Sequence, residues 1–103
     1  MKIQTKKELL DTLARHHSVL QNYGVIRYGI FGSAVRDEID SDSDVDLLVE
    51  FFPGKKNFIN FSELGFFLEE LLERPVDLLT PSSLSPHLGP AILEEVEYVP
   101  INS

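Results

Sequence analysis

The chain has 103 residues, 43% of them hydrophobic, and its 17 acidic and 9 basic side chains give a formal net charge of −8. This length suits one small domain over residues 1–103, and the charge argues against nonspecific nucleic-acid binding or anionic membrane surfaces, which both require basic side chains. Because the sequence has no cysteine, no membrane-spanning apolar run and no signal-peptide stretch at its N-terminus, we expect a cytoplasmic protein without disulfides or thiolate metal sites.

Hydrophobic periodicity predicts alternating helices and strands. Thr5 and Glu8 have the spacing of a capping box, and the leucines that follow recur at helical intervals until Gly24, a typical helix end. A second helical stripe of leucine and phenylalanine runs from Phe61 to Leu72. Strands are predicted where short runs of β-branched, aromatic and leucine residues stand between turn residues. These predicted strands are residues 25–31, 45–52, 75–79 and 96–99.

The segments between these elements are short. We expect residues 34–38 and 91–95 to form short helices. Thr80 and Pro81 suit the start of a helical turn, but the prolines within residues 82–90 break any longer helix there. The order of the elements predicts an α+β fold, in which helices pack on a small mixed β-sheet.

The negative charge is concentrated in one segment. Residues 37–50 contain seven acidic residues and no basic residue, whereas the rest of the chain holds ten acidic and nine basic residues. The acids of this segment are Asp37, Glu38, Asp40, Asp42, Asp44, Asp46 and Glu50. Such a local excess of charge needs a local explanation.

Two motifs point to chemistry with a phosphate and a metal ion. Gly32 and Ser33 directly follow a predicted strand. Glycine lets the backbone approach a ligand closely, and the amides and the serine hydroxyl can donate to a phosphate. Asp44 and Asp46 begin the next predicted strand, where side chains two residues apart point to the same side, about 7 Å apart. Two such carboxylates are unfavourable unless a cation lies between them, and Mg²⁺ prefers oxygen ligands.

A third acid, Asp77, stands inside the otherwise apolar strand predicted at residues 75–79. If this strand lies beside that of Asp46, three carboxylates meet near the phosphate-binding turn. This arrangement suits a two-metal site, in which the metals stabilise the attacking and leaving oxygens and one acid helps to deprotonate a hydroxyl nucleophile. Arg36 follows the turn closely enough to neutralise the charge of a triphosphate.

These motifs carry a family resemblance. The string FGSAVR at residues 31–36, followed by SDVDLLV at residues 43–49, resembles the signature of the DNA polymerase β-like nucleotidyltransferase superfamily. It is most similar to the minimal nucleotidyltransferase antitoxins of the HEPN/MNT toxin–antitoxin type. The resemblance extends over nearly the whole chain, and Asp77 stands where the family has its third acid.

The resemblance implies a reaction and a partner. Antitoxins of this type use ATP and Mg²⁺ to transfer AMP to a tyrosine hydroxyl of a HEPN ribonuclease toxin, which releases pyrophosphate and silences the toxin. The implied partner is thus a HEPN-type toxin in a hetero-oligomer. The implied catalytic and metal-binding residues, with two Mg²⁺ ions, are Asp44, Asp46 and Asp77. The implied nucleotide-binding residues are Gly32, Ser33 and Arg36, of which the first two would hold the β- and γ-phosphates.

Ordinary structural roles are available for the same residues. Asp44 and Asp46 could be solvated acids at the start of a strand, and Ser33 could cap the short helix expected after it. Arg36 could pair with a neighbouring acid. The neighbouring acids are Asp37, Glu38 and Asp40.

Two other functions also remain open. An antitoxin could neutralise its toxin mainly by binding it, and an acidic surface would suit a basic RNA-processing partner. Alternatively, the acceptor of the nucleotide could be a small molecule, although transferases of that kind usually carry a further domain for the acceptor. We expect a partner protein to complete the site instead, with Phe51, Phe52 and Phe58 as candidate contact residues.

Overall fold

A four-stranded β-sheet lies at the centre of the computed structural model, which describes residues 2–40 and 42–101. The strands are β1 (Val25–Phe31), β2 (Val45–Phe51), β3 (Val76–Leu79) and β4 (Glu97–Pro100). Their order is β3–β2–β1–β4; β1 pairs antiparallel with β2 and β4, and β2 pairs in parallel with β3. The predicted α+β fold with a mixed sheet is therefore confirmed.

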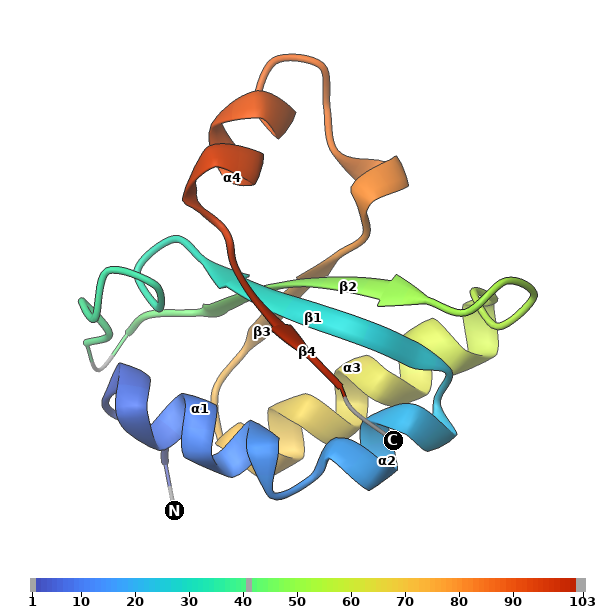
Figure 1. Cartoon of the computed structure of the whole chain (residues 1–103). Coiled ribbons are helices and arrows are strands. Elements are labelled where there is room, and N and C mark those ends of the chain that lie inside the picture. Colours follow the sequence, from blue (N-terminus) through green and yellow to red (C-terminus); the bar gives the residue numbers. More distant parts are fainter. Residues whose placement is uncertain (1, 41, 102–103) are drawn as a thin grey trace.

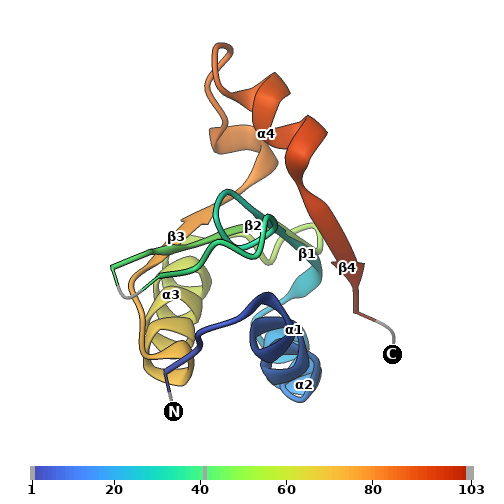
Figure 2. The ribbon, with the colours of Figure 1, turned by 90° about the vertical axis from the view of Figure 1, so that its left-hand side faces the viewer.

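The helices are distributed unequally over the two faces of this sheet. One face is covered by α1 (Lys6–Ala14), α2 (His17–Asn22) and α3 (Phe58–Leu72). From the opposite face project the short 3₁₀ helix η1 (Pro81–Ser83) and α4 (Gly89–Glu95), as the turned view in Figure 2 shows. The chain then enters β4 at the sheet edge (Figure 1). Within the described residues, no helix is long and apolar enough to cross a membrane.

The covered face holds a leucine-rich core. Asn57 caps α3 by accepting a hydrogen bond from the Asn60 N–H (2.8 Å), and leucines at four-residue intervals then face the sheet. They pack with alternate residues of β2, so the intervening side chains of β2 point to the opposite face. Core residues from α3 and β2 are Leu64, Leu68, Leu72, Val45, Leu47 and Val49. Asp46 consequently lies on the face that these three helices leave uncovered.

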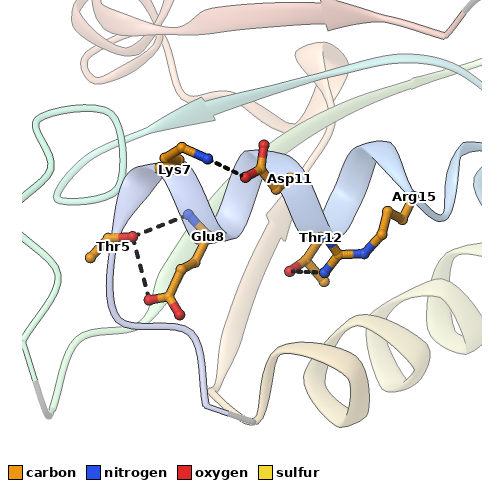
Figure 3. Close-up of polar contacts among 6 residues, drawn as sticks. All are labelled: Thr5, Lys7, Glu8, Asp11, Thr12 and Arg15. Atoms are coloured by element: carbon orange, nitrogen blue, oxygen red, sulfur yellow. Dashed lines mark hydrogen bonds and ion pairs between the residues drawn. The ribbon is translucent and has the colours of Figure 1, made fainter.

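The predicted cap at Thr5 is confirmed with one difference. Thr5 Oγ1 accepts a hydrogen bond from the Glu8 N–H (3.1 Å), as Figure 3 shows. The Glu8 carboxylate accepts a hydrogen bond from the Gln4 N–H (3.2 Å) instead of from the Thr5 backbone. Farther along α1, Lys7 forms an ion pair with Asp11 (2.8 Å), and the Arg15 guanidinium donates to the Thr12 hydroxyl (Figure 3).

The single helix expected to extend from Thr5 to Gly24 is wrong, because the structure has two helices there. His16 has φ −118° and ψ 21°, outside the helical region. Its N–H donates to the Leu13 carbonyl (3.0 Å), and its Nδ1 lies 2.8 Å from the Thr12 carbonyl oxygen. The side chain thus takes the place of a backbone donor, which is how polar residues near a helix end compete with the helix.

The short helix expected at residues 34–38 is also wrong. This segment forms a series of turns in which the Glu38 N–H donates to the Ser33 carbonyl (2.8 Å) and Asp37 takes a left-handed φ of 55°. Because no helix follows, Ser33 is not a helix cap. The other predicted strands and helices are confirmed, with ends that differ by at most three residues.

Leu68 tests the packing between α3 and the sheet. We expect Leu68→Ala to lower the free energy of unfolding by about 2–5 kcal/mol, because it removes a buried side chain and leaves a cavity. Leu93→Ala on α4 is the control, since Leu93 is half exposed, and it should change stability by about 0.5 kcal/mol or less. Urea unfolding measures both variants, and equal losses would contradict this packing.

Candidate active site

Asp46 lies at the centre of an acidic cluster on the uncovered face of the sheet. The parallel register of β2 and β3 places Asp46 directly beside Asp77, and Asp44 precedes Asp46 by two residues. The pKa of Asp46 is raised to about 6, mainly by burial and in addition by the negative charges of Asp77, Asp44 and Glu95. The structure therefore brings the three predicted acids into electrostatic contact.

Gly32 connects this cluster to the turn after β1. Gly32 has a φ of +66°, and a Cβ at this position would overlap with the Asp46 carboxylate. The antiparallel register explains the contact, because Phe31 pairs with Asp46 across β1 and β2. A ligand that approaches the backbone of Gly32 must therefore also approach the Asp46 carboxylate.

Ser33 is half buried beside this glycine. Its carbonyl accepts the hydrogen bond from Glu38, whereas its hydroxyl has no hydrogen-bond partner among residues 2–40 and 42–101. The Ser33 hydroxyl is consequently available to a ligand. The phosphate-binding role of Ser33 stays a prediction, with which a free hydroxyl is compatible.

Arg36 is held by two carboxylates at the edge of the cluster. Its Nε donates to Glu38 Oε1 (2.6 Å), and its Nη1 forms an ion pair with Glu95. The expectation that Arg36 pairs with a neighbouring acid is thus confirmed for Glu38. Arg36 is half exposed and lies near enough to Asp46 to lower the pKa of that carboxyl slightly, against the larger opposing effects of burial and the acids.

Glu95 is a site residue that the sequence motifs did not reveal. It lies 59 positions from Arg36 along the chain, at the last residue of α4. Its place at the site depends on β4, which follows α4 and pairs with β1 next to the turn. The sequence marks Glu95 only as one of two acids at the end of the short helix predicted at residues 91–95. Because acids on short helices are common, this signal does not single out Glu95.

The donor set fits a hard divalent cation, although the side chains are not arranged around one. Among the described residues, no three His, Cys, Asp or Glu side chains form a group arranged to hold a metal. The available donors are carboxylate oxygens, which suit Mg²⁺. Asp44 and Asp77 are exposed, so both side chains can rotate toward an ion near Asp46 without repacking the core. Because Gly32 has no side chain, the Asp46 carboxylate can lie directly against the backbone of the turn.

The raised pKa of Asp46 predicts a gain in stability from Asp46→Asn. At pH 7 the charged Asp46 destabilises the fold, because its pKa of about 6 in the folded protein exceeds the ordinary aspartate value of 3.8. With metal chelated, we expect Asp46→Asn to raise the free energy of unfolding by about 1 kcal/mol, allowing for solvent screening of a half-buried group. The gain should shrink as the pH falls from 6 to 4, where wild-type Asp46 is protonated. Asp42→Asn, at an exposed acid, is the control and should change stability by about 0.5 kcal/mol or less.

A matched glycine pair tests the contact between Gly32 and Asp46. Gly32 and Gly54 both have positive φ, but only Gly32 has a neighbour that a Cβ would meet. We expect Gly54→Ala to cost about 1–2 kcal/mol for the left-handed conformation, and Gly32→Ala to cost clearly more. Chemical unfolding of both variants measures the difference. Equal losses in the free energy of unfolding would show that the Asp46 side chain moves away from the new Cβ at no cost.

The family model of the nucleotidyltransferase domain matches residues 7–99. A protein adenylyltransferase named MntA, from Thermococcus cleftensis, is 41% identical over 96% of this chain and 100% of its own length. A solved structure described as a minimal nucleotidyltransferase has a TM-score of 0.74 at 34% identity, covering 87% of this chain and 92% of that chain. A crystal structure described as a toxin–antitoxin with AMP-PNP shares the fold, with a TM-score of 0.68 at 21% identity over 85% of this chain and 69% of that chain. These findings confirm the resemblance seen in the sequence, and the chain belongs to the nucleotidyltransferase domain family as a homologue of the protein adenylyltransferases.

Proposed function

We propose that this protein is an antitoxin that transfers AMP from ATP to a tyrosine hydroxyl of a HEPN-type ribonuclease toxin. The observation that carries this proposal is the contact between the Gly32 turn and Asp46, with Asp77 in register beside it. A phosphate-binding turn next to acids is what nucleotide transfer requires. Support for the acceptor comes from the relatives named protein adenylyltransferase and from the similarly folded toxin–antitoxin with AMP-PNP.

Each site residue then has a task that its position allows. The Ser33 hydroxyl and the backbone after Gly32 would bind the β- and γ-phosphates, and Arg36 would exchange an acid partner for the nucleotide. Asp44, Asp46 and Asp77 would hold two Mg²⁺ ions, which supply charge stabilisation to the attacking and leaving oxygens. Asp77 is exposed on the edge strand β3 and would receive the proton of the acceptor hydroxyl.

In the proposed transfer, one bond to the α-phosphorus of ATP forms as another breaks. The acceptor oxygen forms a bond to the α-phosphorus of ATP while the bond from that phosphorus to the bridging oxygen breaks. Pyrophosphate leaves with the electron pair of that bond, and the hydroxyl proton passes to a carboxylate. The products are an AMP ester of the toxin and pyrophosphate.

A second function, neutralisation of the toxin by binding alone, is favoured by the exposed apolar side chains near the turn after β2. Phe52 is half exposed and Phe58 is 83% exposed. Phe51, also expected to contact a partner, instead packs against the core. Exposed aromatic side chains of this size are typical of protein contact surfaces, so binding and catalysis can contribute together.

Labelling of the toxin tests the proposal. With Mg²⁺ and ATP labelled at the α-phosphate, we expect the cognate HEPN-type toxin to become labelled on tyrosine, as mass spectrometry would verify. Asp46→Asn should reduce the initial rate on the order of 100-fold or more, because it removes a proposed metal ligand. Asp42→Asn removes the same charge from the same segment and should retain activity.

Three outcomes distinguish the functions. Equal labelling by wild type and Asp46→Asn would contradict catalysis at this site. If the Asp46→Asn variant no longer labels the toxin but still silences the ribonuclease, this would favour neutralisation by binding. Labelling of a small molecule in place of the toxin would support the alternative in which the acceptor is a small molecule.

A further inference from the structure

Arg74 is a buried cation that no sequence motif singled out. The residue is only 4% exposed, although it lies two positions before the start of β3. Its Nε donates to the Ile3 carbonyl (2.5 Å), and its Nη1 donates to the carbonyls of Asp40 (2.6 Å) and Ser43 (3.0 Å). Arg74 thus connects the N-terminal segment to both ends of the loop that leads into Asp44.

The partners of Arg74 are unusual for a buried charge. Buried charges generally pair with opposite charges, whereas within the described residues Arg74 has no carboxylate within 4 Å and is held by carbonyl oxygens. Hydrogen bonds that involve a charged group are stronger than those between neutral groups, and removing one partner leaves the other unsatisfied. The three carbonyls therefore have fixed positions relative to the guanidinium.

The geometry around Asp44 shows what these contacts fix. The Ser43 carbonyl belongs to the peptide bond that joins Ser43 to Asp44. The next peptide group is held as well, because the Val45 N–H donates to the Pro75 carbonyl (2.9 Å). Arg74 and Pro75 are consecutive, so one short segment holds the peptide groups on both sides of Asp44. The same segment continues into β3, where Asp77 pairs with Asp46.

We propose that Arg74 is a positioning residue for metal binding, which sets the backbone of Asp44 relative to Asp46 and Asp77. This inference rests on the proposed function, since it assumes that the three acids bind a metal. Asp44 needs such support because it precedes β2 and is not itself in the sheet. The Arg74 guanidinium forms no hydrogen bond with the carboxylates of the three proposed metal ligands, and it acts only through backbone carbonyls.

Two variants at Arg74 separate charge from geometry. Arg74→Lys keeps the charge, but a compact ammonium lacks the planar fork that reaches three carbonyls, and Arg74→Met keeps an extended apolar side chain without charge. We expect both variants to bind Mn²⁺ about 10–100-fold more weakly than wild type, the range typical when a group that orients a metal ligand is removed. Activity should show a raised half-saturating Mg²⁺ concentration with kcat at saturating Mg²⁺ little changed.

Arg27→Met is the matched control. It also removes one arginine charge, but Arg27 pairs with Glu50 (2.7 Å) and stacks on the Tyr98 ring, away from Asp44. Its Mn²⁺ affinity should stay within about twofold of wild type. Mn²⁺ titration followed by electron paramagnetic resonance measures the free ion, whose sharp signal is lost on binding, so bound Mn²⁺ follows by difference. Unfolding curves recorded in parallel give the folded fraction. Unchanged Mn²⁺ affinity of the folded Arg74 variants would overturn the inference and assign Arg74 to stability alone.

A measurement on wild type covers the case in which both Arg74 variants fail to fold. Coupling between two sites is reciprocal, so metal binding should in turn hold Arg74 more firmly. We expect saturating Mg²⁺ to slow hydrogen exchange of the Arg74 Nε–H, followed by ¹⁵N NMR, and an unchanged rate would overturn the inference. Wild-type protein that binds neither Mn²⁺ nor Mg²⁺ would refute the proposed function and the inference together. If wild-type protein binds metal and labels the toxin, the proposed function stands, and the Arg74 measurements then test the inference alone.

Discussion

The pairing of β2 with β1 on one side and with β3 on the other determines where the candidate site lies. The antiparallel register brings the turn at Gly32 against the Asp46 carboxylate, and the parallel register brings Asp77 beside the same residue. Three segments that are distant in sequence thus meet at one position of the central strand. A shift of either register by one residue would turn Asp46 toward the leucine core, so stability and site geometry are specified together.

The two faces of β2 have opposite energetic roles. Val45, Leu47 and Val49 stabilise the fold by burial, whereas Asp46 lies between them on a face where its charge is unfavourable. A protein selected for stability alone would have a neutral residue at position 46. The retention of a carboxylate there, flanked by further acids, is understandable if a cation stabilises the charge in the working protein. The same helices that complete the core also leave this face free for a ligand.

Local sequence signals predicted the strands and the turn at Gly32 well, because alternation, β-branched residues and glycine act over a few neighbours. They failed where a side chain overrode the local preference, as His16 does at the break between α1 and α2. They also failed for Glu95 and Arg74, whose partners lie 59 positions and more than 30 positions away. A single arginine before a strand carries no local pattern, since its role is defined by carbonyls that only the fold brings near.

The concentration of acids in residues 37–50 has more than one cause. Asp37 accepts a hydrogen bond from the Lys6 N–H (2.8 Å), Asp40 accepts bonds from Asp42 and Ser43 within its own loop, and Glu38 pairs with Arg36. These acids are explained by local structure. Asp44, Asp46 and Asp77 have no ion pair within 4 Å among the described residues. Solvation accounts for Asp44 and Asp77, which are exposed, but not for Asp46, whose pKa is raised by burial. Asp46 is therefore the residue that distinguishes an ordinary acidic surface from a cation site. Its substitution by Asn tests which of these two interpretations holds.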